Sequence, residues 1–166
     1  MAVYITGNGI GYNNSSPAAG TIQSFSGGVQ YALWNDYVDA ISVNEDADII
    51  PGYAYAFDGS KYYKTTSQGD PNYFGLESDT YGLGIGFRDE KVMHIPVAGF
   101  ALAYTDKIYE PGTKLTCTKD GMLTAATYEE RFQIIATFWK PEEKEEISDG
   151  SRSIKVNGRN WVRVIR

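Results

Sequence analysis

The chain has 166 residues but only one cysteine, Cys117, and one histidine, His94. A single thiol cannot form an internal disulfide, and two isolated residues cannot build the multi-histidine or multi-cysteine sites that hold zinc. One histidine also excludes the HExxH metalloproteases, which need two. We therefore expect no metal and no cofactor, and the low cysteine content favours folding inside a cell.

Basic residues are missing from one end of the chain. Residues 1–50 contain no lysine or arginine and five acidic residues, whereas residues 140–166 carry seven basic and five acidic residues. The whole chain has a formal net charge of −6. Because nucleic-acid binding is driven largely by clustered positive charge, we expect no nucleic-acid partner. The acidic start and the basic end could attract each other between subunits, or both could be solvated faces of one domain.

Long hydrophobic runs are absent from the sequence too. No apolar run approaches the roughly 18 residues of a membrane span, and residues 1–5 lack the basic and apolar regions of a secretory signal. We expect a soluble protein without a membrane partner. What the chain has in quantity is glycine, 18 residues, and tyrosine, 13 against 7 phenylalanines and 3 tryptophans. This composition favours short strands and tight turns over a helical bundle.

The N-terminal segment differs in composition from the rest. Residues 1–28 are rich in Gly, Asn, Ser and Ala without a sustained period, so they form either a disordered tail or an extended arm that orders against a partner. Residues 29–43 have apolar residues at helical spacing, but residues 37–43 also alternate like a strand. We expect residues 1–45 to be an extended N-terminal arm with a possible short helix, and residues 46–166 to be a β-rich domain.

Turn signals separate short apolar or alternating runs beyond residue 48. Residues 49–66 and 109–127 each contain Pro-Gly, an alternating run, Asp-Gly and a second run, which indicates two similar hairpins. Asn157-Gly158 predicts a hairpin between residues 153–156 and 160–165, because this pair readily adopts a type I′ turn. The expected strands are residues 52–57, 61–65, 81–87, 92–104, 114–118, 122–125, 132–139, 153–156 and 160–165.

The residues that could support catalysis are few. His94 lies in a strand-like run, which favours a structural histidine, and a dyad with Cys117 would lack a nucleophile elbow or helix start beside the thiol. Gly82, Gly84 and Gly86 do not have the spacing of a phosphate loop and favour a strand that another backbone approaches closely. Acidic residues are plentiful, but a carboxylate pair for glycoside cleavage cannot be placed from the sequence. We predict no catalytic residues and a protein that is not an enzyme.

Several tyrosines cluster in the first part of the β-rich region. They could form a sugar-stacking platform on an exposed sheet face, or an interface between subunits with their hydroxyls at its wet rim. The interface is the interpretation we favour. The residues concerned are Tyr53, Tyr55, Tyr62, Tyr63 and Tyr73.

Residues 95–166 resemble the decoration, or cement, proteins encoded in the head-gene clusters of tailed bacteriophages. The resemblance rests on VAGFALAYTDKIYEPGTKLTCTKDGMLTAAT (97–127), QIIATFWKPEEKEE (133–146) and SIKVNGRNWVRVIR (153–166). These segments follow the order Pro-Gly, strand, Asp-Gly, strand, hydrophobic strand, charged connector and closing Asn-Gly hairpin. Residues 48–66 add a weaker match, and the first 45 residues do not align to the family.

The resemblance implies a mainly β fold, either a small β-barrel or a β-tulip-like domain, with an extended N-terminal arm. It implies a non-enzymatic homotrimer that binds the major capsid protein on the outer surface of the virion and is made in the host cytoplasm. The alternative is a carbohydrate-binding or host-adhesion module displayed on a phage particle. The residues expected to contact the capsid or another subunit are Val3, Tyr4, Ile5, Ile22, Phe25, Arg159, Trp161 and Arg163.

Overall fold

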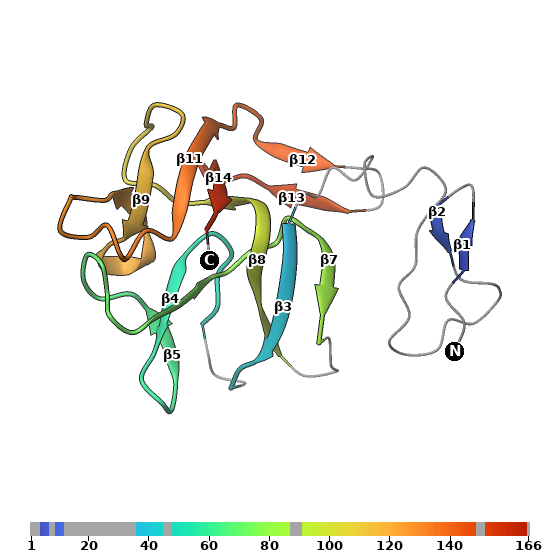
Figure 1. The fold of residues 1–166 in the computed structure, drawn as a ribbon, viewed down its shortest axis with the longest axis horizontal. Helices are drawn as coiled ribbons and strands as arrows, with labels where there is room; N and C mark the ends of the chain where they lie inside the picture. The colour runs from blue at the N-terminus through green and yellow to red at the C-terminus, as the bar shows by residue number, and fades with distance from the viewer. Residues whose placement is uncertain are drawn as a thin grey trace. The chain divides into compact units, whose positions relative to one another are not determined.

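The computed structural model describes residues 4–6, 9–11, 36–44, 48–86, 91–148 and 152–165 (Figure 1). The chain divides into two units, Met1–Leu33 and Trp34–Arg166. In the first unit, β1 (Tyr4–Thr6) pairs antiparallel with β2 (Gly9–Gly11). The other described strands belong to the second unit, so the division falls before residue 45. No helix in these described ranges is long and apolar enough to cross a membrane.

The second unit is built on a seven-stranded sheet with the strand order β10-β9-β11-β14-β8-β3-β7. Neighbouring strands are antiparallel except β3 and β7, which are parallel. The sheet consists of β3 (Asp36–Ser42), β7 (Tyr81–Ile85), β8 (Val92–Ala103), β9 (Lys114–Cys117), β10 (Leu123–Ala125), β11 (Ala136–Pro141) and β14 (Asn160–Val164).

Two smaller sheets belong to the same unit in the described residues. In the first, β4 (Ala54–Phe57) lies between β5 (Tyr62–Lys64) and β6 (Tyr73–Leu76). In the second, β12 (Glu146–Ser148) pairs with β13 (Ser153–Lys155). A 3₁₀ turn, η2 (Lys119–Gly121), connects β9 to β10. The expected mainly β class is confirmed, but the expected barrel is not closed, because β10 and β7 end the large sheet and do not pair with each other in the described residues.

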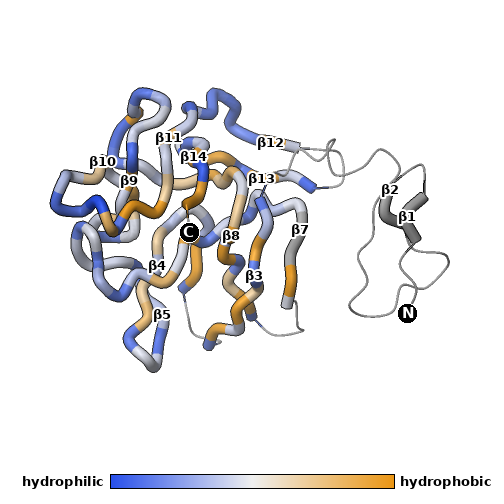
Figure 2. Tube along the Cα trace, viewed as in Figure 1, coloured by the Kyte–Doolittle hydropathy of each residue, from blue (hydrophilic) through white to orange (hydrophobic). Residues whose placement is uncertain are grey.

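The long strand β8 organises the hydrophobic core. Its alternating side chains point to opposite faces of the sheet, so Ala101 and Ala103 join one buried cluster while Leu102 joins another with Trp161. At the other end of β8, Met93 and Ile95 pack against Tyr55 in a third cluster. Figure 2 shows hydrophobic residues concentrated along β3 and β8 and hydrophilic residues along the connection from β11 to β12 and the outer loops.

The ambiguous segment before residue 45 is a strand where the structure describes it. β3 runs from Asp36 to Ser42 and pairs along its whole length with β8, so the possible helix does not form over these residues. Residues 29–35, where that helix would have begun, lie outside the described residues. The pairing with β8 decided between helix and strand. A short segment that fits both the helical and the strand period adopts the structure that hydrogen bonds to its neighbours stabilise.

The Asn-Gly turn forms as predicted, but the hairpin does not. Asn157 and Gly158 both have positive φ, and the Arg159 N–H donates to the Val156 carbonyl at 3.0 Å, which closes a type I′ turn. The strands on either side then separate, since β13 pairs with β12 while β14 pairs with β8 and β11. The prediction of a hairpin was therefore wrong. The two Asp-Gly hairpins, β4 with β5 and β9 with β10, are confirmed.

Candidate functional site

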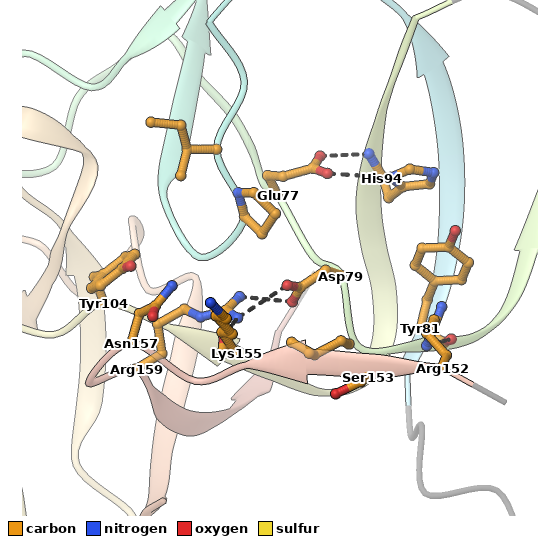
Figure 3. Close-up of a pocket in the computed structure, with 13 residues that line it drawn as sticks. Glu77, Asp79, Tyr81, His94, Tyr104, Arg152, Ser153, Lys155, Asn157 and Arg159 are labelled. Carbon is orange, nitrogen blue, oxygen red and sulfur yellow. Dashed lines mark hydrogen bonds and ion pairs between the residues drawn. The ribbon is translucent and has the colours of Figure 1, made fainter. Parts of the chain in front are cut away.

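A pocket of about 450 Å³ lies in the second unit where four parts of the chain meet. They are the loop before β4, the connection from β6 to β7, strand β8, and the segment from β13 through the Asn-Gly turn (Figure 3). Seven of the side chains that line it are charged or strongly polar. They are the acids Glu77 and Asp79, the bases Arg152, Lys155 and Arg159, the imidazole of His94 and the carboxamide of Asn157.

Side chains along the connection from β6 to β7 alternate between the pocket and the protein interior, and the two acids are on the pocket side. Glu77 and Asp79 line the pocket, whereas Ser78 and Thr80 are fully buried on the other side and contact Asp36 of β3. The Ser78 hydroxyl donates to Asp36 Oδ2, and the Ser78 and Thr80 hydroxyls lie 2.9 Å apart. These buried bonds hold the segment against the large sheet and turn both acids toward the pocket.

Asp36 is itself in an unusual environment. It is 3% exposed, and its Oδ1 atom forms no hydrogen bond among the described residues. Burial, which outweighs the hydrogen bonds from Ser78 and Thr80, raises the pKa of Asp36 to about 6. Ionisation of Asp36 near neutral pH therefore costs the folded protein stability.

Glu77 holds His94 in position. One carboxylate oxygen accepts the His94 backbone N–H, and the other lies 3.2 Å from Nδ1 of the ring. Burial raises the pKa of Glu77, while the hydrogen bonds from His94 act in the opposite direction. The ring also stacks on Tyr81, with centroids 4.6 Å apart. His94 thus has the partners of a structural histidine, and it also lines a pocket that its strand-like sequence did not indicate.

Asp79 forms a two-point ion pair with Arg159. The distances are 2.7 Å from Nη1 to Oδ1 and 3.0 Å from Nη2 to Oδ2. Arg159 is 2% exposed, and its Nε and Nη2 atoms also donate to the carbonyls of Val156 and Lys155. The guanidinium therefore fastens the Asn-Gly turn to the β6–β7 connection. Beyond the turn the two strands separate, since β13 pairs with β12 and β14 pairs with β8 and β11.

A second feature is a protruding loop between β10 and β11, residues 127–133, which we call the aromatic loop. Tyr128 is 75% and Phe132 is 86% exposed. The Arg131 guanidinium lies over both rings, 4.4 Å and 4.6 Å from their centroids. Glu130 anchors the loop, because one of its carboxylate oxygens accepts the Thr127 N–H at 2.7 Å and the Gln68 amide at 2.9 Å. The aromatic rings are thus presented to solvent on an ordered scaffold.

The predicted contact residues near the C-terminus differ in their exposure to solvent. Arg159 and Trp161 are 2% and 5% exposed and are unavailable to a partner at the surface of this chain. Trp161 packs in the cluster with Leu102, and its indole N–H donates to Glu142 at 2.7 Å. Arg163 is exposed on β14, so only one of these three residues is accessible.

The other predicted contacts are in the first unit. Tyr4 and Ile5 lie on β1, where Ile5 is opposite Ile10 of β2. Val3, Ile22 and Phe25 lie outside the described residues, so their predicted roles stay predictions.

The glycine-rich run has a structural position. Residues 81–85 form strand β7, and a Cβ atom at Gly86 would lie 3.0 Å from the Ala40 carbonyl oxygen, which confirms the close backbone approach.

The cysteine is structural too. Cys117 is 1% exposed in the main cluster, and burial raises the pKa of its thiol. A buried thiol of this kind is a poor nucleophile. Among the described residues, no group of three or more His, Cys, Asp or Glu side chains is arranged to hold a metal.

The tyrosine cluster does not form an open platform. Tyr55 is 1% exposed, and its hydroxyl bonds the backbone at residues 48 and 50. Tyr62 packs between Phe57 and Phe74, and Tyr53 stacks on Tyr104 with centroids 4.4 Å apart. Most of the ring surface is therefore used within the fold.

Comparison with known proteins adds no relative: no family model, no curated protein and no solved structure matches the chain.

Sequence reasoning missed Glu77 and Asp79 as partners of His94 and Arg159. The residues are 17 and 80 positions apart in these pairs, and no motif of fixed spacing connects them.

Proposed function

We propose that the protein is a non-enzymatic structural protein that binds the outer surface of a bacteriophage capsid and reinforces the junctions between capsomers. The resemblance of residues 95–166 to phage decoration proteins motivates the partner, the major capsid protein, and the homotrimeric state. The observation that carries the binding role is the aromatic loop. Tyrosine and arginine are enriched at interface hot spots, and here they are joined by a phenylalanine and exposed to solvent.

The order of the aromatic loop suits it to docking. Backbone bonds from Arg131 to Tyr128 and from Gln133 to Glu130 close successive turns at 3.3 Å and 2.7 Å. A loop that is already ordered loses little conformational entropy on binding, so more of its contact energy contributes to affinity. The exposed rings would gain most from burial, since aromatic side chains bring a large apolar area to an interface.

The N-terminal unit provides a second means of attachment in this proposal. Its scattered apolar residues are suited to a neighbouring groove or sheet edge on the assembled shell. In a homotrimer each such contact is repeated, so contacts that are weak singly combine into strong attachment. Because the binding surface spans several capsid subunits, attachment stabilises the assembled shell in preference to free subunits.

Co-sedimentation with empty expanded capsids of the encoding phage tests the proposal. The full-length protein should bind saturably and show little binding to free capsid subunits. A Tyr128→Ser, Phe132→Ser double variant should bind at least about tenfold more weakly, as expected for hot-spot residues. Ile108→Ser is the matched control, because Ile108 is 66% exposed and lies in a different loop.

Removal of residues 1–28 tests the arm in the same assay, and light scattering gives the mass of the free assembly. Weaker binding by the truncated protein and a trimeric mass support the proposal. Failure of the full-length protein to bind capsids would overturn it. Equal binding by the double variant and the unmodified protein would remove the aromatic loop from the contact.

A further inference from the structure

The two acids of the pocket are already paired with basic side chains. Asp79 is bonded at two points by Arg159, and Glu77 is bonded by His94. Arg152 and Lys155 line the pocket too, so the lining carries charges of both signs. A strongly charged ligand of either sign would lie beside side chains of its own sign, which is costly. This mixture favours a ligand without a net charge.

The same pairs leave hydrogen-bonding capacity unused. An ionised carboxylate can accept about four hydrogen bonds, and Asp79 receives two from Arg159. On another wall of the pocket, Lys155 and Asn157 are exposed, and their side-chain nitrogens form no hydrogen bond or ion pair with the described residues. The pocket thus offers acceptors on the β6–β7 connection and donors beside the Asn-Gly turn. A hydroxyl group can satisfy both, since it donates and accepts.

The remaining wall of the pocket is apolar and aromatic. Ile50, Pro51 and Tyr104 line it, and Tyr104 is held by its stacking on Tyr53. Sugars have hydroxyl groups at the ring edge and C–H groups on the ring faces, and such a face packs on an aromatic or apolar side chain. The volume of about 450 Å³ lies in the range of about 300 to 1,000 Å³ typical of small-molecule sites.

We infer that this pocket binds a neutral, hydroxyl-rich ligand, namely a sugar unit of a glycan. The acids accept bonds from its hydroxyls, Lys155 and Asn157 donate to them, and the wall at Tyr104 receives its apolar face. The inference is independent of capsid binding, because none of its residues belongs to the aromatic loop. It also moves the glycan-binding hypothesis from the tyrosine cluster, whose rings are packed within the fold, to the pocket.

Titration of the full-length protein by NMR with four neutral probes tests the inference. The probes are D-glucose, D-galactose, L-rhamnose and N-acetyl-D-glucosamine, with D-glucuronate and D-glucosamine as charged comparisons. At least one neutral probe should bind saturably. Lys155→Met should weaken that binding by about tenfold, because a hydrogen bond from a charged donor is lost. Tyr104→Phe keeps the ring and should weaken it less. Lys119→Met, at an exposed lysine outside the pocket, is the matched control.

The outcomes separate the two proposals made for this protein. Saturable binding of a neutral probe that is weakened in Lys155→Met and kept in Lys119→Met and in the Tyr128→Ser, Phe132→Ser variant supports the inference. No saturable binding of any neutral probe overturns it, as does binding of the charged probes alone. Binding that Lys155→Met and Tyr104→Phe leave unchanged also overturns it, because the ligand would then lie elsewhere. None of these results depends on capsid attachment.

Discussion

Asp36 should make the protein less stable as the pH rises toward neutrality. The side chain is 3% exposed, and burial raises its pKa from 3.8 to about 6. Between these two values the folded state keeps a proton that the unfolded state has released, so the free energy of unfolding falls as the pH rises. A difference of about two pKa units, at 1.36 kcal/mol each, corresponds to roughly 3 kcal/mol lost between about pH 4 and pH 6.

Asp36→Asn isolates this contribution. The amide still accepts the Ser78 hydroxyl and cannot ionise, although a buried N–H₂ group without partners lowers stability by a constant amount at every pH. The comparison is therefore between slopes and not between absolute stabilities. Other titrating groups, including Glu77, are present in both proteins and cancel. From about pH 4 to about pH 7.5 the variant should lose roughly 3 kcal/mol less than the unmodified protein.

Urea unfolding at several pH values, followed by tryptophan fluorescence, measures these slopes, because Trp161 is 5% exposed and reports on the second unit. Asp120→Asn is the matched control: Asp120 is exposed, and its positive φ of 68° is one that asparagine also tolerates. The control should follow the unmodified protein. Parallel pH profiles for Asp36→Asn and the unmodified protein would refute the reasoning that ionisation of this buried carboxylate opposes folding.

Three further predictions concern the fold. Asp79→Ala leaves the Arg159 guanidinium buried without its carboxylate, so the free energy of unfolding measured in urea should fall by about 3 kcal/mol. A loss below about 1 kcal/mol would contradict the structural role of the pair. Gly52→Ala should lower the free energy of unfolding by about 1 to 3 kcal/mol more than Gly112→Ala. The two glycines have nearly the same φ, 91° and 92°, but of the two only Gly52 would place a Cβ atom against another residue, 2.4 Å from Arg159 Cδ. Equal losses in the two variants would refute this. Cys117 should react with a thiol reagent only as fast as the protein opens, and rapid reaction of the folded protein would show that the thiol is accessible.

The hairpins with Asp-Gly turns were predictable because they are local. In β4–β5 and β9–β10 the turn residues and the alternating runs lie within one short segment, so propensity and pattern agree on the same structure. The Asp58 side chain also caps its own turn by accepting the N–H groups of Ser60 and Lys61 at 2.9 Å and 3.0 Å. Such bonds depend on residues a few positions apart and are visible in the sequence.

The candidate site was much less predictable. The sequence singled out His94 and Arg159, but it assigned His94 to a strand interior and Arg159 to an interaction surface. Their environments come from Glu77 and Asp79 in a connection that carries no motif. The acids reach the pocket only because Ser78 and Thr80 are anchored to Asp36, on a strand that follows the N-terminal unit.

What the sequence determined by itself is therefore the mainly β class, the turns and most of the strands, since these follow from spacing and from residues with special backbone preferences. The tertiary structure decided which strands pair. The type I′ turn at Asn157-Gly158 formed as its residues dictate, yet β13 paired with β12 and β14 paired with β8 and β11. Long-range hydrogen bonding and the burial of Arg159 and Trp161 outweighed the local preference for a hairpin, because buried polar and apolar groups must find partners across the whole chain.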